Sequence, residues 1–153
     1  MSGPILIVDD EPDIRELIAY GLGRGGWQVE TAGNGADALA RLCGSRPGGI
    51  VLDLLLPDIH GLGILEMVRQ LWTENPVPVI VASCLQTSEL QAEALAEGAD
   101  AFLPKPFILE DLVALVEQLC PKEPRRIPSV PATGRPKRIK DRCRTGGKTG
   151  ATR

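Results

Sequence analysis

Five polar side chains in this sequence stand where short apolar runs end. Asp9 and Asp10 follow the first run, Asp53 and Ser83 end two later ones, and Lys105 follows a brief fourth. Clustered carboxylates repel one another, and a hard divalent cation such as Mg²⁺ relieves that repulsion through oxygen ligands. A metal, an ammonium and a hydroxyl together suit a phosphoryl group, whose oxygens need charge neutralisation and a hydrogen-bond donor.

Strands that alternate with helices would position these side chains. Such alternation predicts a parallel sheet with helices on both faces, and right-handed crossovers place the carboxyl ends of all its strands at one edge. A ligand site belongs at that edge, near the point where the strand order reverses. The apolar patterns predict strands over residues 4–8, 27–32, 50–53, 77–82 and 101–103, and helices over 12–24, 36–43, 62–72, 88–97 and 109–119.

Asp53 is the carboxylate around which we place the chemistry. An acid at the end of a buried strand costs free energy unless it is used or paired. Carboxylates form acyl phosphates, so we interpret Asp53 as a nucleophile. An aspartate can also simply cap a helix, but three of them on one edge together with Lys105 favour a chemical site.

The charge distribution divides the 153-residue chain into an acidic body and a basic tail. Residues 1–120 hold 6 basic and 18 acidic side chains, whereas residues 121–153 hold 11 basic and 2 acidic ones. The tail is rich in proline and glycine and has almost no apolar residues, so we expect it to be disordered. The basic cluster in this tail suits weak binding to an anionic partner, or association with the acidic body of the same chain. Without aromatic residues or a helix-turn-helix pattern, we do not expect specific nucleic-acid binding.

The cysteines and the amino terminus indicate the cellular location. The four cysteines form no CxxC pair, which predicts reduced thiols, and we expect the Cys84 thiol to be buried. The first apolar run is too short for a signal peptide or a membrane span. We therefore expect a cytoplasmic protein without membrane insertion.

Several motifs occur together in one known family. They resemble the receiver domain of bacterial two-component response regulators of the single-domain type, and the resemblance covers residues 4–120. It implies a flavodoxin-like, doubly wound α/β fold with a five-stranded parallel sheet in the order 2-1-3-4-5, in a receiver domain spanning residues 1–120. The motifs are Val-Asp-Asp-Glu at 8–11, Ala-Gly-Asn-Gly-Ala-Asp-Ala-Leu at 32–39, Asp-Leu-Leu-Leu-Pro-Asp-Ile-His-Gly at 53–61, Pro-Val-Ile-Val-Ala-Ser at 78–83 and Phe-Leu-Pro-Lys-Pro-Phe at 102–107.

The resemblance also implies a role for each acidic position. Asp53 would accept a phosphoryl group from a sensor histidine kinase or a phosphotransfer protein. Asp10 would bind Mg²⁺ directly and Asp9 largely through water, with Asp53 and the Leu55 backbone carbonyl as further ligands. Such a protein is not an enzyme in the usual sense, although self-dephosphorylation is expected.

The remaining implied roles concern the response to phosphorylation. Ser83 would hydrogen-bond the phosphoryl group, Lys105 would pair with it, and Phe102 would move inward as Ser83 shifts. The fourth helix, fifth strand and fifth helix would then control a downstream partner protein. Cys84 is a departure, because this position usually holds a very small residue in the family.

Two other functions are open at this level. A transcriptional regulator would use the basic tail to bind DNA. The other is a phosphatase with an aspartyl nucleophile on a similar sheet. Such enzymes resemble a pattern with the nucleophile on the first strand and a second aspartate two residues later, whereas Asp9 and Asp10 are adjacent.

Overall fold

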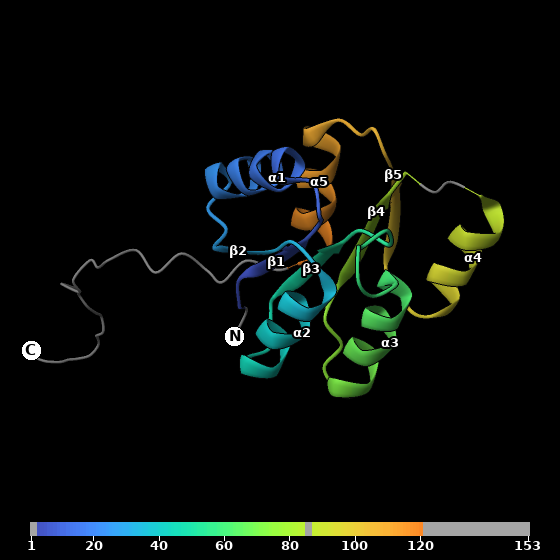
Figure 1. The fold of residues 1–153 in the computed structure, drawn as a ribbon. Helices are drawn as coiled ribbons and strands as arrows, with labels where there is room; N and C mark the ends of the chain where they lie inside the picture. The colour runs from blue at the N-terminus through green and yellow to red at the C-terminus, as the bar shows by residue number, and fades with distance from the viewer. Residues whose placement is uncertain (1–2, 85–86, 121–153) are drawn as a thin grey trace, which may run out of the picture. The chain divides into compact units, whose positions relative to one another are not determined.

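The computed structural model describes residues 3–84 and 87–120, in which five strands alternate with five helices (Figure 1). The elements are β1 (Ile5–Val8), α1 (Pro12–Arg24), β2 (Val29–Ala32), α2 (Gly35–Gly44), β3 (Gly49–Leu52), α3 (Gly61–Leu71), β4 (Val79–Ser83), α4 (Ser88–Ala96), β5 (Ala101–Pro104) and α5 (Leu109–Leu119).

The strands form one parallel sheet in the order β2-β1-β3-β4-β5. Figure 1 shows α1 and α5 together on one side of this sheet, and α2 and α3 on the other. The order reverses between β1 and β3, because the chain crosses from β2 back over β1 to reach β3. The predicted doubly wound fold and its strand order 2-1-3-4-5 are thus confirmed.

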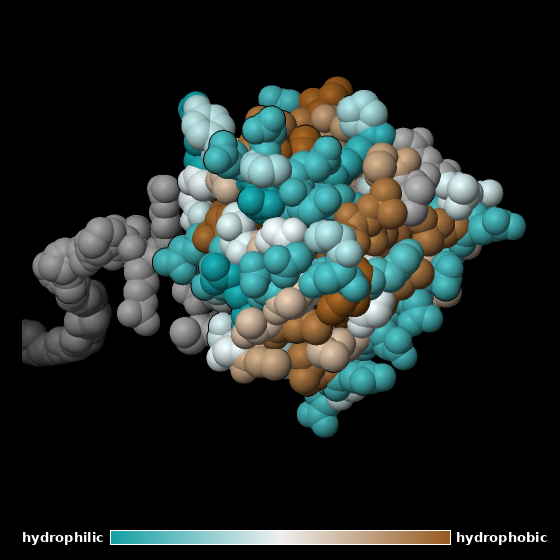
Figure 2. Space-filling model, in the orientation of Figure 1, coloured by the Kyte–Doolittle hydropathy of each residue, from teal (hydrophilic) through white to brown (hydrophobic). Residues whose placement is uncertain are grey.

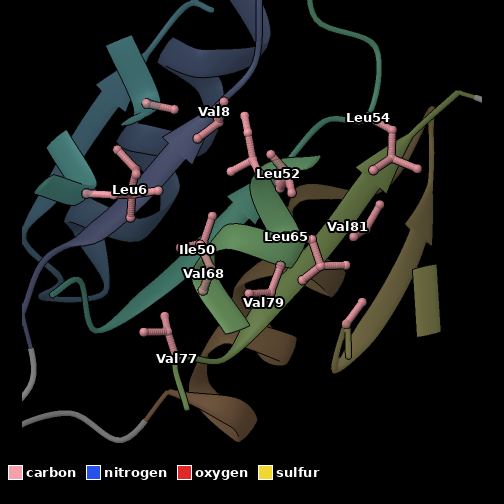
Figure 3. Packing of buried hydrophobic residues seen from close by; sticks show 14 of the residues in the cluster. Leu6, Val8, Ile50, Leu52, Leu54, Leu65, Val68, Val77, Val79 and Val81 are labelled. Carbon is pink, nitrogen blue, oxygen red and sulfur yellow. The ribbon is translucent and has the colours of Figure 1, made fainter. Parts of the chain in front are cut away.

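The core lies in two apolar layers, one on each face of the sheet. Alternate residues of a strand enter opposite layers, so Leu6 and Val8 pack with α2, α3 and α4, whereas Ile5 and Ile7 pack with α1 and α5. In Figure 3, Leu65 and Val68 of α3 lie over the side chains of the sheet. The three central strands β1, β3 and β4 are buried along their whole length. Their carboxyl ends therefore form a well-packed edge of the sheet, and the polar residues lie at that edge.

The element boundaries differ from the predicted ones for physical reasons. Strand β2 begins at Val29 rather than Trp27, because the Trp27 amide donates to the Leu22 carbonyl oxygen in the turn after α1. Gly26 adopts a φ of 94° in that turn, a conformation that glycine tolerates best. Strand β4 begins after Pro78, which has no N–H to donate to a neighbouring strand.

Some apolar side chains remain on the surface of the described residues. Leu55 is 41% exposed and Ile108 is 63% exposed. Figure 2 shows apolar residues among the hydrophilic ones on the face that it presents. No helix among residues 3–84 and 87–120 is both long and apolar enough to cross a membrane. The predicted disordered tail, 121–153, lies outside the described residues.

Candidate functional site

The carboxyl ends of β1 and β3 bring two of the predicted aspartates side by side. Val8 and Leu52 are register partners in the parallel pair, and Asp9 and Asp53 follow them directly. The Asp53 amide donates to the Val8 carbonyl oxygen at 2.9 Å, which continues the pairing by one step. The sheet itself therefore sets the spacing of the two acids.

The three predicted acidic residues form a cluster. One carboxylate oxygen from each of Asp9, Asp10 and Asp53 lies within 4.8 Å of the others. Asp9 is only 2% exposed and Asp53 only 3%, whereas Asp10 is exposed. Carboxylate oxygens are the donors that Mg²⁺ prefers, so this donor set fits a hard divalent cation.

Lys105 lies in the same cluster. Its Nζ donates to Asp9 Oδ2 at 2.7 Å and to Asp53 Oδ2 at 3.0 Å, and its side chain is only 9% exposed. The sheet explains this position, since Lys105 follows β5 and its amide donates to the Ser83 carbonyl oxygen at 2.9 Å. A single ammonium thus serves two buried carboxylates.

Backbone amides hold the second oxygen of each buried carboxylate. The Glu11 amide donates to Asp9 Oδ1 at 2.9 Å, and the Leu55 amide donates to Asp53 Oδ1 at 3.0 Å. With Lys105 on the other oxygen, both carboxyl groups are fixed in orientation. An oriented carboxylate needs little rearrangement before it acts as a ligand or as a nucleophile.

Burial and pairing have opposite effects on the ionisation of this cluster. Burial raises the pKa of Asp9 above its usual value of 3.8, and the hydrogen bond from Lys105 offsets this only in part. Burial alone would lower the pKa of Lys105, but its hydrogen bonds with Asp9, Asp53 and Glu11 outweigh burial and raise it. The ammonium therefore stays charged at neutral pH. Its single positive charge is too little to balance the three carboxylates that it contacts.

Two of the other predicted site residues lie in the sheet, and Leu55 lies in the loop after β3. Ser83 is the last residue of β4, is fully buried, and is the register partner of Pro104, which precedes Lys105. Phe102 lies in β5, is half-buried, and packs against the core layer that contains Val81. Leu55 follows Asp53 closely, and its amide already contacts the Asp53 carboxylate.

One expectation about this region is wrong. Cys84 is exposed rather than buried. Strand β4 ends at Ser83, so the next residue leaves the sheet and its side chain reaches solvent.

Sequence reasoning missed one residue that contacts Lys105. Glu11 Oε1 accepts from Lys105 Nζ at 3.1 Å. Glu11 stands next to Asp10 at the end of β1, so its place in the acidic run was the available signal. Spacing alone did not reveal that its longer side chain reaches Lys105.

Asp58 lies in the loop after Pro57, and its carboxylate has a structural partner. Its carboxylate accepts from the amides of Gly35 at 2.7 Å and Ala36 at 2.9 Å, at the start of α2. These two hydrogen bonds lower the pKa of Asp58. No local sequence motif predicts this contact, because more than 20 residues separate Asp58 from its two partners in the sequence.

His60 is exposed and caps α3. Its Nδ1 accepts from the Leu62 amide at 3.1 Å. This contact gives the histidine a structural role at the end of the loop that follows Asp53.

The sequence matches the response regulator receiver domain over residues 5–117. The chain therefore belongs to this family, whose members are signalling domains of two-component systems rather than enzymes in the usual sense.

The relatives and solved structures agree with this assignment. The probable transcriptional regulatory protein TcrX of Mycobacterium tuberculosis is 37% identical over 116 residues, which cover 75% of this chain and 48% of TcrX. The transcriptional regulatory protein PrrA of Mycobacterium leprae is 38% identical over 120 residues, covering 78% of this chain and 51% of PrrA. The chain thus spans about half the length of these curated relatives.

Two solved receiver structures share the fold. The BeF3-activated receiver domain of DrrB from Thermotoga maritima is 30% identical, with a TM-score of 0.71 over 78% of this chain and 97% of that one. The chemotaxis protein CheY4 of Vibrio cholerae is 29% identical, with a TM-score of 0.71 over 78% of this chain and 99% of that one.

Proposed function

We propose that Asp53 accepts a phosphoryl group in a reaction that depends on Mg²⁺. The donor is a phosphohistidine on a sensor histidine kinase or on a phosphotransfer protein. The observation that carries the proposal is the buried cluster at the carboxyl edge of the sheet, where Lys105 Nζ lies 3.0 Å from Asp53 and 2.7 Å from Asp9.

In the proposed step, a carboxylate oxygen of Asp53 attacks phosphorus and forms an acyl phosphate. The bond between phosphorus and the donor's imidazole nitrogen breaks, and the imidazole leaves with that electron pair. Lys105 then pairs with the phosphoryl oxygens, and Ser83 supplies a hydrogen-bond donor. Both groups are buried, so their interactions with the transferred charge are stronger than they would be in water.

The chain offers a suitable set of ligands for the metal. Asp9, Asp10, Asp53 and the Leu55 carbonyl would hold Mg²⁺, which would neutralise charge on the phosphoryl oxygens. The oxygen-only donor set and the incomplete neutralisation by one ammonium support this assignment.

Phosphorylation then changes the surface of α4, β5 and α5, which controls a downstream partner protein. Phe102, half-buried in β5, is the residue that we expect to move inward as Ser83 shifts toward the phosphoryl group. Water later hydrolyses the acyl phosphate, so the protein resets itself by self-dephosphorylation.

We further propose that residues 1–120 are the receiver domain, that residues 121–153 are a separate basic tail, and that the protein acts in the cytoplasm. The names of its relatives TcrX and PrrA favour a second candidate, a role in transcription. Salt-dependent binding of the full chain to duplex DNA would support that candidate. Family membership speaks against the phosphatase alternative.

The proposal is tested by incubating the protein with a small-molecule phosphodonor and Mg²⁺ and measuring the mass of the intact chain. We expect a phosphoryl adduct on the wild-type protein, no adduct when the metal is chelated, and none on Asp53→Asn. An adduct of equal yield on Asp53→Asn would refute the proposal.

A further inference from the structure

Glu11 has an unusual position for its residue type. It is the N-cap residue of α1, where a short serine, threonine, aspartate or asparagine side chain normally accepts from a helix amide. The Glu11 side chain makes no such bond. Its carboxylate instead lies 3.1 Å from Lys105 Nζ, and the side chain remains 59% exposed.

The contact matters because an ammonium has only three N–H bonds. Asp9, Asp53 and Glu11 give Lys105 three carboxylate acceptors, at 2.7, 3.0 and 3.1 Å. When Lys105 donates to a phosphoryl oxygen, one of these acceptors must give way. Asp9 and Asp53 are buried in the proposed metal and phosphoryl site, whereas Glu11 lies toward solvent.

From this geometry, and resting on the function proposed above, we infer that Glu11 is a positioning residue for Lys105. Its carboxylate holds the ammonium toward the solvent side of the site and competes with the incoming phosphoryl group for it. Glu11 therefore weakens the interaction between Lys105 and the phosphoryl oxygens, and so limits the stability of the phosphorylated state.

The test uses beryllofluoride, a phosphoryl analogue, with the full chain at saturating Mg²⁺ for each variant. Glu11→Gln keeps the size of the side chain and removes its charge. Asp13→Asn is the matched control, because Asp13 is an exposed acid in the first turn of the same helix and makes no ion pair within residues 3–84 and 87–120. Both variants remove one negative charge at the start of α1, but only Glu11→Gln removes the charge from an acceptor of Lys105 and so weakens that hydrogen bond.

We expect Glu11→Gln to bind beryllofluoride more tightly than Asp13→Asn by about two- to fivefold, the effect of a partly exposed ion pair. Equal affinities in the two variants would overturn the inference and leave the proposed function standing. Failure of the wild-type protein to bind beryllofluoride with Mg²⁺ would overturn the proposed function, and the inference with it.

A second readout needs neither metal nor anion. In the metal-free protein, NMR can follow the exchange of the Lys105 ammonium protons with water. We expect faster exchange in Glu11→Gln than in the wild type or in Asp13→Asn, because one hydrogen bond that protects the ammonium is weakened. An unchanged exchange rate would show that Glu11 does not hold Lys105 in solution.

Discussion

At the scale of single residues, the site gathers more negative charge than Lys105 can balance. Asp9 and Asp53 are both almost completely buried, and Glu11 also takes a share of the same ammonium. Buried charges cost folding free energy unless they are fully paired. The cluster therefore lowers the stability of the metal-free protein, and the same carboxylates provide a site that can bind a cation.

Asp9→Asn tests this cost. We expect the variant to unfold at a higher temperature than the wild type at neutral pH without metal, because the neutral amide needs less solvation while Asp53 and Glu11 still pair with Lys105. Thermal unfolding followed by circular dichroism measures the difference. A lower unfolding temperature would mean that the pair with Lys105 contributes more than burial costs.

The pH dependence of this difference follows from the direction of the shift. The folded-state pKa of Asp9 is raised above 3.8, so the protonated form favours folding. That contribution is complete below pH 3.8 and is lost as the pH rises through the folded-state pKa. The gain from Asp9→Asn should therefore be present at neutral pH and vanish below pH 3.8. Asp10→Asn, at an exposed position, is the control.

At the scale of elements, Asp58 ties the loop that carries Asp53 to the start of α2. Its carboxylate accepts from two amides at a helix amino terminus, where the helix dipole also favours negative charge. Gly35 lets the loop approach closely, because an added Cβ would lie 2.8 Å from Ile59 Cβ. The contact therefore helps to fix the loop between Asp53 and α3.

Asp58→Asn should destabilise the protein at neutral pH, since an amide is a weaker acceptor for these amides and carries no charge. The pKa of Asp58 is lowered below 3.8, so its contribution is present above pH 3.8 and is lost as the pH falls through the folded-state value. Urea unfolding at several pH values measures this, with the exposed Glu66→Gln as the control. A difference from wild type that persists at the lowest pH would exclude an electrostatic origin.

Helix α4 is the least firmly packed of the helices among the described residues. Its only buried residue is Ala94, and the apolar Leu95 is 44% exposed. Helix α3, by contrast, buries Ile64, Leu65 and Val68. Elements that move in switches come from the less stable parts of a fold.

Hydrogen exchange should distinguish the two helices. In the unphosphorylated protein, we expect the amides of α4 to exchange faster than those of α3. Equal protection of the two helices would argue against α4 as the mobile part of the switching surface.

At the scale of the whole molecule, the sequence predicts the fold well because the sheet leaves strong local signals. Strands such as Ile5–Val8 are buried on both faces and are continuously apolar, so their order along the chain determines which polar residues share an edge. The clustering of Asp9, Asp53 and Lys105 follows from that topology alone. It needs no knowledge of side-chain conformation.

What the sequence did not predict depends on contacts between distant segments. The reach of Glu11 to Lys105 depends on the direction of a long side chain after β1, and the partners of Asp58 lie across a loop. The exposure of Cys84 depends on where β4 ends. Periodicity carries no information about any of these three features.

The central claim is that Asp53 is the phosphoryl acceptor, and locating the phosphoryl group tests it most directly. Borohydride reduces an aspartyl phosphate to homoserine, which peptide mass spectrometry can place in the sequence. After treatment with a small-molecule phosphodonor and Mg²⁺, we predict homoserine at position 53 and unmodified Asp9 and Asp10. Homoserine at position 9 or 10, or none in the chain, would contradict the account.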